Sequence, residues 1–147
     1  MTARSATDAI EIRGIDHVVL RVRDIARSLR FYGELLGCRE ERRIEALGLV
    51  QLRAGAALID LVDVAGPLGK AGGSPPGEEA RNLDHLALQL AVFDEAAIRA
   101  RLAAAGVEAG EVGDRYGAEG MGPSLYIRDP DGNVVELKGP GALRPGA

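Results

Sequence analysis

The sequence predicts an α+β fold made of two copies of a βαβββ module. Each half of the chain opens with an Asp-His pair and an alternating apolar run, at His17 in the first half and His85 in the second. A helical pattern follows each run and stops at a glycine, Gly37 or Gly106. A Gly- and Pro-rich segment, residues 66–80, separates the halves. The chain is therefore interpreted as an internal repeat that places its two histidines at matching positions.

The bulk composition is that of an ordinary soluble protein, with 46% apolar and 27% charged residues. A net charge of −4 with scattered arginines provides no broad basic patch, which argues against nucleic acid as a partner. No run approaches the roughly 20 apolar residues of a membrane-spanning helix. The N-terminus also lacks the apolar core of a signal peptide. We therefore expect a cytoplasmic protein that binds a small molecule and no membrane.

The length of 147 residues fits one domain. We expect that domain to span residues 14–138. Its parts are module one, a linker and module two, over residues 14–65, 66–80 and 81–138. Residues 1–13 lack periodicity and residues 139–147 are rich in Pro and Gly, so both termini are expected to be loose.

In module one, the alternating run predicts a strand over residues 14–23 with His17 and Arg21 on the same face. Asp24 is a good N-cap for a helix over residues 25–36. Three short extended segments complete the module, over residues 39–44, 47–53 and 56–64. The linker is too rich in Gly and Pro to be expected to hold regular structure.

Module two repeats this order, with a strand over residues 83–90 and an Ala-rich helix over residues 94–105. Its other strands are expected over residues 107–112, 124–128 and 134–138. A glycine-rich loop is expected over residues 113–122. The Asp-Pro-Asp-Gly-Asn sequence at residues 129–133 predicts the hairpin turn between the last two strands.

Each module also places one carboxylate among apolar neighbours in its last strand, Asp60 in module one and Glu136 in module two. Burying such a group is unfavourable unless it is paired or bound to a metal. One lone histidine or acid would be explained more simply as a packed or edge residue. Two imidazoles and two carboxylates at repeat-related positions instead form an N2O2 ligand set, suited to Ni, Co, Zn, Mn or Fe(II). The candidate metal ligands are His17, Asp60, His85 and Glu136.

The span of residues 14–138 resembles the vicinal oxygen chelate superfamily, which includes glyoxalase I, extradiol dioxygenases, methylmalonyl-CoA epimerase, and bleomycin and fosfomycin resistance proteins. The motifs that carry the resemblance are His17–Val22, Phe31-Tyr32, Leu36-Gly37 and residues 129–137. The resemblance implies that the two modules form a cup-shaped mixed sheet, with helices outside, around a divalent metal. It also implies a homodimer, because two chains of this superfamily often exchange modules and share each metal.

Within the superfamily, the ligand pattern is most similar to glyoxalase I, a lyase/isomerase. That resemblance implies a metal that acts as a Lewis acid toward two adjacent substrate oxygens, and a Glu136 carboxylate that moves a proton between adjacent carbons. Arg21 resembles the arginine that helps to hold glutathione. The sequence departs from the pattern at Asp60, where glutamate is usual, and at Val64, where a glutathione-contacting asparagine is expected. The substrate is therefore left open.

Two alternatives remain. Extradiol ring cleavage would use Fe(II) held by His17, His85 and Glu136, and Tyr126 matches the tyrosine of that family. The chain has no third histidine for that family's acid–base role. The other alternative is a non-catalytic, resistance-type binding protein. Such members usually lack the metal ligands and line a groove with aromatic residues, whereas this chain has the ligands and only 3% aromatic residues.

The remaining candidate substrate contacts are Tyr126 and two residues of the glycine-rich loop, Arg115 and Tyr116. The loop either closes over the metal as a lid or is a plain connection. Tyr126 either touches the substrate or packs in its strand with the hydroxyl at the rim.

Overall fold

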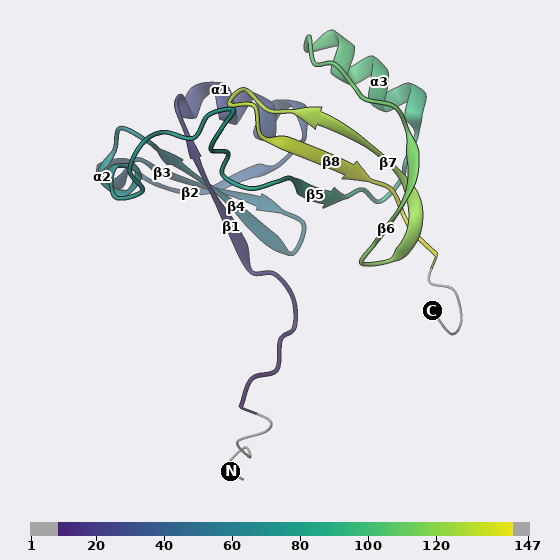
Figure 1. Cartoon of the computed structure of the whole chain (residues 1–147), viewed down its shortest axis with the longest axis horizontal. Helices are drawn as coiled ribbons and strands as arrows, with labels where there is room; N and C mark the ends of the chain where they lie inside the picture. The colour runs from purple at the N-terminus through teal and green to yellow at the C-terminus, as the bar shows by residue number, and fades with distance from the viewer. Residues whose placement is uncertain (1–8, 143–147) are drawn as a thin grey trace.

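The computed structural model describes residues 9–142, which form two four-stranded mixed sheets, one per module (Figure 1). The strand orders are β1-β4-β3-β2 and β5-β8-β7-β6. In each sheet the first strand of the module runs parallel to the last, and the other pairs are antiparallel. The predicted class, an α+β fold of two βαβββ modules, is confirmed. No helix within the described residues is long and apolar enough to cross a membrane.

Module one contains β1 (His17–Val22), α1 (Ile25–Leu29), the π-helix η2 (Arg30–Leu35), β2 (Arg39–Ile44), the 3₁₀ turn η3 (Glu45–Leu47), β3 (Leu49–Ala54) and β4 (Ala57–Asp63). Asp24 caps α1 as expected, since its carboxylate accepts the backbone N–H of Arg27 at 3.1 Å. The first strand begins at His17, so the expected start at Gly14 is wrong by three residues.

The helix predicted over residues 25–36 changes from α to π geometry at Arg30. In the π segment the N–H of Leu36 bonds to the carbonyl of Phe31, five residues earlier. Phe31 and Tyr32, adjacent in sequence, are both buried, with exposed fractions of 5% and 0%. The hydrophobic spacing locates a helix but does not reveal this wider turn, which accommodates two consecutive aromatic residues in the core.

The expectation that residues 66–80 hold no regular structure is wrong at one point, because Pro67–Lys70 form the short helix α2. Proline at the first position has its φ preset for a helix. Gly69 lies against the backbone of module one, where an added Cβ would come within 1.9 Å of the Asp63 carbonyl oxygen. A glycine that is typical of a linker is here required by close packing.

Module two contains β5 (Leu86–Gln89), α3 (Glu95–Ala104), β6 (Gly113–Gly117), β7 (Gly120–Arg128) and β8 (Val134–Lys138). The strand predicted over residues 107–112 and the loop predicted over residues 113–122 are both wrong. The apolar residues Val107, Ala109 and Val112 instead pack beside the core. The glycine-rich segment forms the β6–β7 hairpin, in which Gly113 pairs with Ser124 and Gly117 with Gly120. Cross-strand hydrogen bonding therefore outweighs the low strand propensity of glycine.

The termini also differ in part from expectation. Residues 9–16 contain no helix or strand. Residues 139–142, expected to be loose, instead bond to β7, where the N–H groups of Gly139 and Ala142 donate to the carbonyls of Pro123 and Met121. The rest of both predicted loose ends, residues 1–8 and 143–147, lies outside the described residues.

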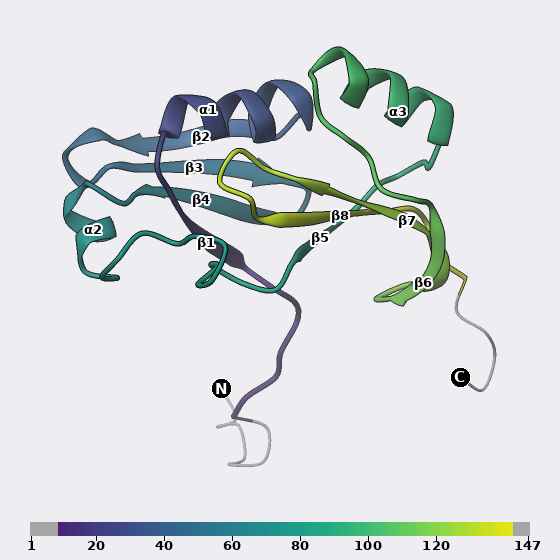
Figure 2. The same cartoon turned by 45° about the horizontal axis from the view of Figure 1, so that its top comes forward.

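One apolar core joins the two modules. α1 and α3 lie on the same side of the two sheets (Figure 2). The core cluster includes Leu20 and Leu61 from sheet one, Leu125 and Leu137 from sheet two, and Leu102 from α3. Because strand side chains alternate, the opposite face of each sheet carries the other set of residues. The candidate ligands belong to that second set.

A buried carboxylate fixes module two against module one. The Tyr32 hydroxyl donates to Asp129 Oδ2 at 2.6 Å, and Asn133 Nδ2 donates to the same oxygen at 2.8 Å. Asp129 Oδ1 accepts the backbone N–H groups of Asp131 and Asn133 at 2.9 and 2.8 Å. Burial, followed by the nearby Asp129 charge, raises the pKa of Tyr32, which therefore remains a donor. The β7–β8 turn is thus bonded to the helical segment of module one.

We expect Tyr32→Phe to lower the free energy of unfolding by about 1.5–3 kcal/mol, because it removes a hydrogen bond to a charged, buried acceptor. Urea denaturation followed by circular dichroism measures the change. Tyr116→Phe is the matched control, since this side chain is 65% exposed, and its effect should stay within about 0.5 kcal/mol. Equal effects of the two variants would contradict the role of Tyr32.

Candidate metal centre

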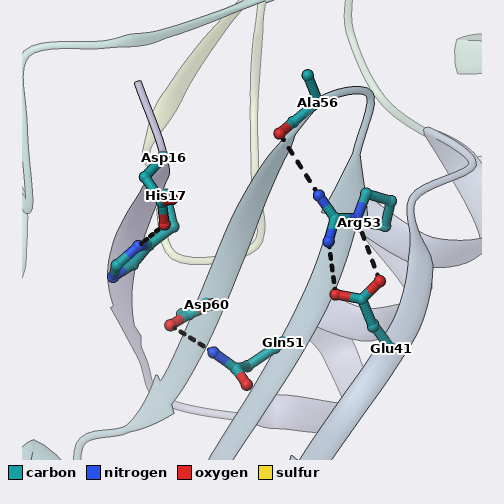
Figure 3. A network of polar contacts seen from close by, with 7 residues as sticks. All are labelled: Asp16, His17, Glu41, Gln51, Arg53, Ala56 and Asp60. Carbon is teal, nitrogen blue, oxygen red and sulfur yellow. Dashed lines mark hydrogen bonds and ion pairs between the residues drawn. The ribbon is translucent and has the colours of Figure 1, made fainter. Parts of the chain in front are cut away.

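The module-one half of the candidate centre lies on β1, β4 and β3. The parallel register pairs Val19 with Asp60, so Asp60 lies on the same sheet face as His17. Figure 3 shows Asp60 and Gln51 side by side, with His17 on the neighbouring strand. Asp60 is only 5% exposed, and its Oδ2 accepts Gln51 Nε2 at 3.1 Å. Its Oδ1 is buried and has no hydrogen-bond partner among the described residues.

The module-two half lies on β8 and β7 and on the residue that precedes β5. His85 Nε2 is 3.4 Å from Glu136 Oε1, and Glu136 is 6% exposed. Tyr126 pairs with Glu136 across the ladder, and its ring meets the His85 ring edge to face at 5.7 Å between centroids. Desolvation and the Glu136 carboxylate raise the pKa of Tyr126. Its hydroxyl is therefore protonated at neutral pH and can donate a hydrogen bond toward this site.

Both histidines contact the aspartate that precedes them. His17 Nδ1 is 2.6 Å from Asp16, and His85 Nδ1 is 2.6 Å from Asp84. An ionised carboxylate can only accept, so Nδ1 is the donor in each pair. The hydrogen bond with Asp16, followed by the Asp60 charge, raises the pKa of His17, and the hydrogen bond with His85 lowers the pKa of Asp84. This arrangement orients each ring and leaves Nε2 for another partner, as in histidines that bind metals.

The four predicted ligands form two pairs and do not gather at one point. Among residues 9–142, no group of three or more His, Cys, Asp or Glu side chains is placed to hold a metal ion. Each pair nevertheless offers one imidazole nitrogen and one carboxylate, and the partnerless Asp60 Oδ1 is an oxygen that a cation would satisfy. The donor chemistry therefore fits a divalent metal, with half of the ligand set in each module.

The Arg21 side chain lies on the same sheet face as His17, but its guanidinium is hydrogen-bonded to the linker. Its Nη1 donates to the carbonyls of Gly72 and Ser74, both at 3.1 Å, and its Nη2 donates to those of Gly69 and Gly73 at 2.8 and 2.7 Å. An added Cβ at Gly72 would lie 2.5 Å from Arg21 Cζ. The predicted substrate contact thus binds four backbone carbonyls of its own chain.

The other predicted contacts lie on the two faces of sheet two. Arg115 is on the Tyr126 face, with its guanidinium carbon 4.6 Å from the centre of the Tyr126 ring. Tyr116, the next residue of β6, points to the opposite face and is 65% exposed. Sequence reasoning missed three polar residues on the ligand faces, Gln51, Ser124 and Lys138. Strand alternation could have revealed Lys138, which lies two residues after Glu136.

Comparisons with known proteins show the family of the chain. Residues 14–137 match the family described as the Glyoxalase/Bleomycin resistance protein/Dioxygenase superfamily. The chain belongs to this superfamily. The match spans both modules and the linker, so membership covers both halves of the candidate centre.

Several relatives share this superfamily fold. A virulence protein of Salmonella typhimurium is 30% identical over 128 residues, which cover 84% of this chain and 81% of the relative. Its crystal structure has a TM-score of 0.68 at 29% identity and covers 89% of this chain and 99% of that chain. An integron cassette protein from the mobile metagenome of V. cholerae has a TM-score of 0.67 at 26% identity and covers 88% of this chain and 97% of that chain. A lactoylglutathione lyase from Agrobacterium tumefaciens has a TM-score of 0.60 at 21% identity, with 87% and 94% covered, which is a likeness of fold alone.

In the metal-free protein we expect the imidazole of His17 to titrate above 6.5, because Asp16 and Asp60 favour its charged form. Asp16→Asn removes the largest cause and should move the pKa of His17 back toward 6.5. NMR titration measures both values, and His85→Gln assigns the two histidine signals. The Asp–His contact is contradicted if the pKa of His17 is at or below 6.5 and does not change in Asp16→Asn.

Proposed function

We propose that the protein is a divalent-metal-dependent enzyme with glyoxalase-I-like lyase/isomerase chemistry, acting on a small molecule that presents two adjacent oxygens. The observation that carries the proposal is the duplicated His–carboxylate pair. In each module a histidine oriented through Nδ1 lies on the same sheet face as a nearly buried acid, Asp60 at 5% and Glu136 at 6% exposure. Such acids are unfavourable in a binding protein without a cation.

The proposal includes a homodimer in which two chains complete each metal centre. Each chain supplies a His17–Asp60 pair and a His85–Glu136 pair that remain separate within it. β1 and β5 are edge strands of the two sheets. The outer side of β1 is covered at Arg21, whose backbone N–H and carbonyl bond to the Asn82 side chain. A strand of a second copy can therefore adjoin β1 only before Arg21, or can adjoin β5. Val19, beside His17 on β1, is 49% exposed and apolar, as a residue at an interface would be.

A divalent metal bound by these residues would supply Lewis-acid activation of the two substrate oxygens. Glu136 is the proposed base that takes a proton from one substrate carbon and returns it to the next. Tyr126, kept protonated beside Glu136, donates a hydrogen bond to the substrate at the same site. Asp60 is held at one oxygen by Gln51, so we assign it a ligand role and not the proton transfer.

The proposal does not include glutathione as part of the substrate. Both terminal nitrogens of the Arg21 guanidinium are bonded to linker carbonyls, so they are not free for a peptide carboxylate. Val64 likewise offers no side-chain hydrogen bond where the glutathione-contacting asparagine would be expected. The proton-transfer chemistry requires neither of these contacts.

We expect purified protein to bind Ni²⁺ or Zn²⁺, measured by calorimetry and elemental analysis. His85→Ala should weaken binding by more than the roughly 10–100-fold that is typical of outer-shell changes. Glu111→Ala, an exposed acid away from both pairs, is the control. The methylglyoxal–glutathione hemithioacetal and smaller α-hydroxy ketones serve as isomerisation substrates, and Glu136→Gln should abolish turnover. The proposal fails if wild-type protein binds no divalent metal and His85→Ala changes no ligand affinity.

Mixed dimers test whether two chains share each centre. One variant carries His17→Ala and Asp60→Ala, and the other carries His85→Ala and Glu136→Ala. Neither should bind metal alone, but a dimer of the two would contain one centre with all four native ligands. Metal binding and turnover should therefore reappear on mixing after partial denaturation and refolding. If a mixed dimer is verified and remains inactive, the centre is not formed by these four residues from two chains.

A second candidate, extradiol ring cleavage with Fe(II), is favoured by one observation, the contact of Tyr126 with the His85 ring. Both histidines are used as ligands in that reaction, so no imidazole remains as acid–base group. Oxygen uptake with catechols and Fe(II) distinguishes the two reactions. Metal binding without either activity would favour a non-catalytic small-molecule-binding protein.

A further inference from the structure

We propose that Arg115 and Lys138 form a binding site for an anionic group of the substrate, a carboxylate or a phosphate. The inference rests on the proposed function, because it adds a substrate anion to the sheet face that carries Glu136. The two cations themselves belong to neither His–carboxylate pair. Their ligand can therefore be tested in the absence of metal.

The ladder of sheet two places the two cations around Ser124. Ser124 pairs with Lys138 on β8, and Tyr126 pairs with Glu136, so these four side chains share one face. From the other side, Arg115 on β6 donates through Nη1 to the Ser124 carbonyl at 2.7 Å and to Ser124 Oγ at 2.9 Å. The Arg115 guanidinium thus bonds to Ser124, and Lys138 is the cross-strand partner of the same serine, with its ammonium directed to the Gly120 carbonyl.

Lys138 is a buried charge without a counter-charge. It is 5% exposed, and its Nζ has two acceptors, the carbonyls of Gly120 and Gly139 at 3.3 and 3.5 Å. Both distances exceed the about 2.7–3.2 Å of ordinary N–H···O bonds. No ion pair within residues 9–142 involves Lys138 or Arg115. Because buried ammonium groups are normally paired, an external anion is the partner that this site lacks.

Two glycines make room for the lysine. An added Cβ at Gly117 would lie 3.0 Å from Lys138 Cε, and one at Gly122 would lie 2.9 Å from Lys138 Nζ. Gly122 is also the cross-strand partner of Arg115. The same Cβ at Gly122 would lie 2.6 Å from the Pro140 carbonyl oxygen, so the Lys138 amine and the backbone of Pro140 share the space beside Arg115.

The geometry also indicates the class of substrate. Lys138 lies two residues beyond Glu136 on the same strand, about 7 Å along the sheet. This is the spacing of the two backbone positions, and the Lys138 ammonium extends beyond it toward the Gly120 carbonyl. Arg115 can bind a carboxylate or phosphate through its planar donors, and Lys138 adds a point charge. We therefore expect a small anionic substrate.

The test uses metal-free protein and two probes, malonate for a carboxylate and inorganic phosphate for a phosphate, titrated by calorimetry. At least one probe should bind the wild type. Lys138→Met and Arg115→Gln should each weaken that binding by about tenfold or more. Lys70→Met is the matched control, since Lys70, the other lysine of the chain, is exposed on α2 and should leave affinity unchanged. The probe that binds more tightly identifies the anionic group.

The proposal is overturned if neither probe binds the wild type, or if both variants bind as the wild type does. It is also overturned if Lys138→Met only lowers the melting temperature or separates the dimer, since the amine would then serve the hairpin or the interface. If Lys138→Met fails to fold, Arg115→Gln decides by itself, with Lys138→Arg expected to retain the affinity.

Calorimetry with Ni²⁺ on the same variants separates this inference from the proposed function. If the protein binds metal but no anion, only the proposal of the anion site is contradicted. If the protein binds no metal but binds an anion in a way that depends on Lys138, only the proposal of a metal-dependent enzyme is contradicted.

Discussion

The arrangement of the whole chain depends on the buried carboxylate of Asp129. It accepts the Tyr32 hydroxyl of module one and three N–H groups of its own turn, so it has the partners that a buried charge needs. This contact joins the helical side of module one to the end of sheet two. Because α1, α3 and the apolar sheet faces form the common core, the polar faces of the sheets lie outside it.

The same constraint explains why the candidate ligands form pairs. Each module is a complete structural unit, in which the first strand lies beside the last and brings one histidine near one acid. The contact of Asp129 with Tyr32 joins the β7–β8 turn of module two to the helical segment of module one. In the proposed homodimer, a second copy supplies the other half of each centre.

Sequence patterns predicted what depends on local periodicity. They predicted the βαβββ repeat and the Asp24 cap. They failed where long-range contacts decide the outcome. The β6–β7 hairpin is stabilised by pairing with the rest of sheet two, despite its glycines. The set of backbone carbonyls that bind the Arg21 guanidinium depends on the path of the linker, whose sequence has no periodic pattern. The alternation of side chains along a strand assigns a residue to one sheet face, but it does not show which segments of the chain pack against that face.

The two ligand faces share an energetic property. Sheet one buries the Asp60 Oδ1 acceptor without a donor, and sheet two buries the Lys138 ammonium without an anion. Each unmatched group is unfavourable to the folded chain alone, and each would be matched by a ligand of opposite charge. A ligand that binds only the folded state stabilises it by mass action, so a metal at Asp60 and an anion at Lys138 would offset these terms. The proposed metal and anion sites would each supply the charge that its sheet face lacks.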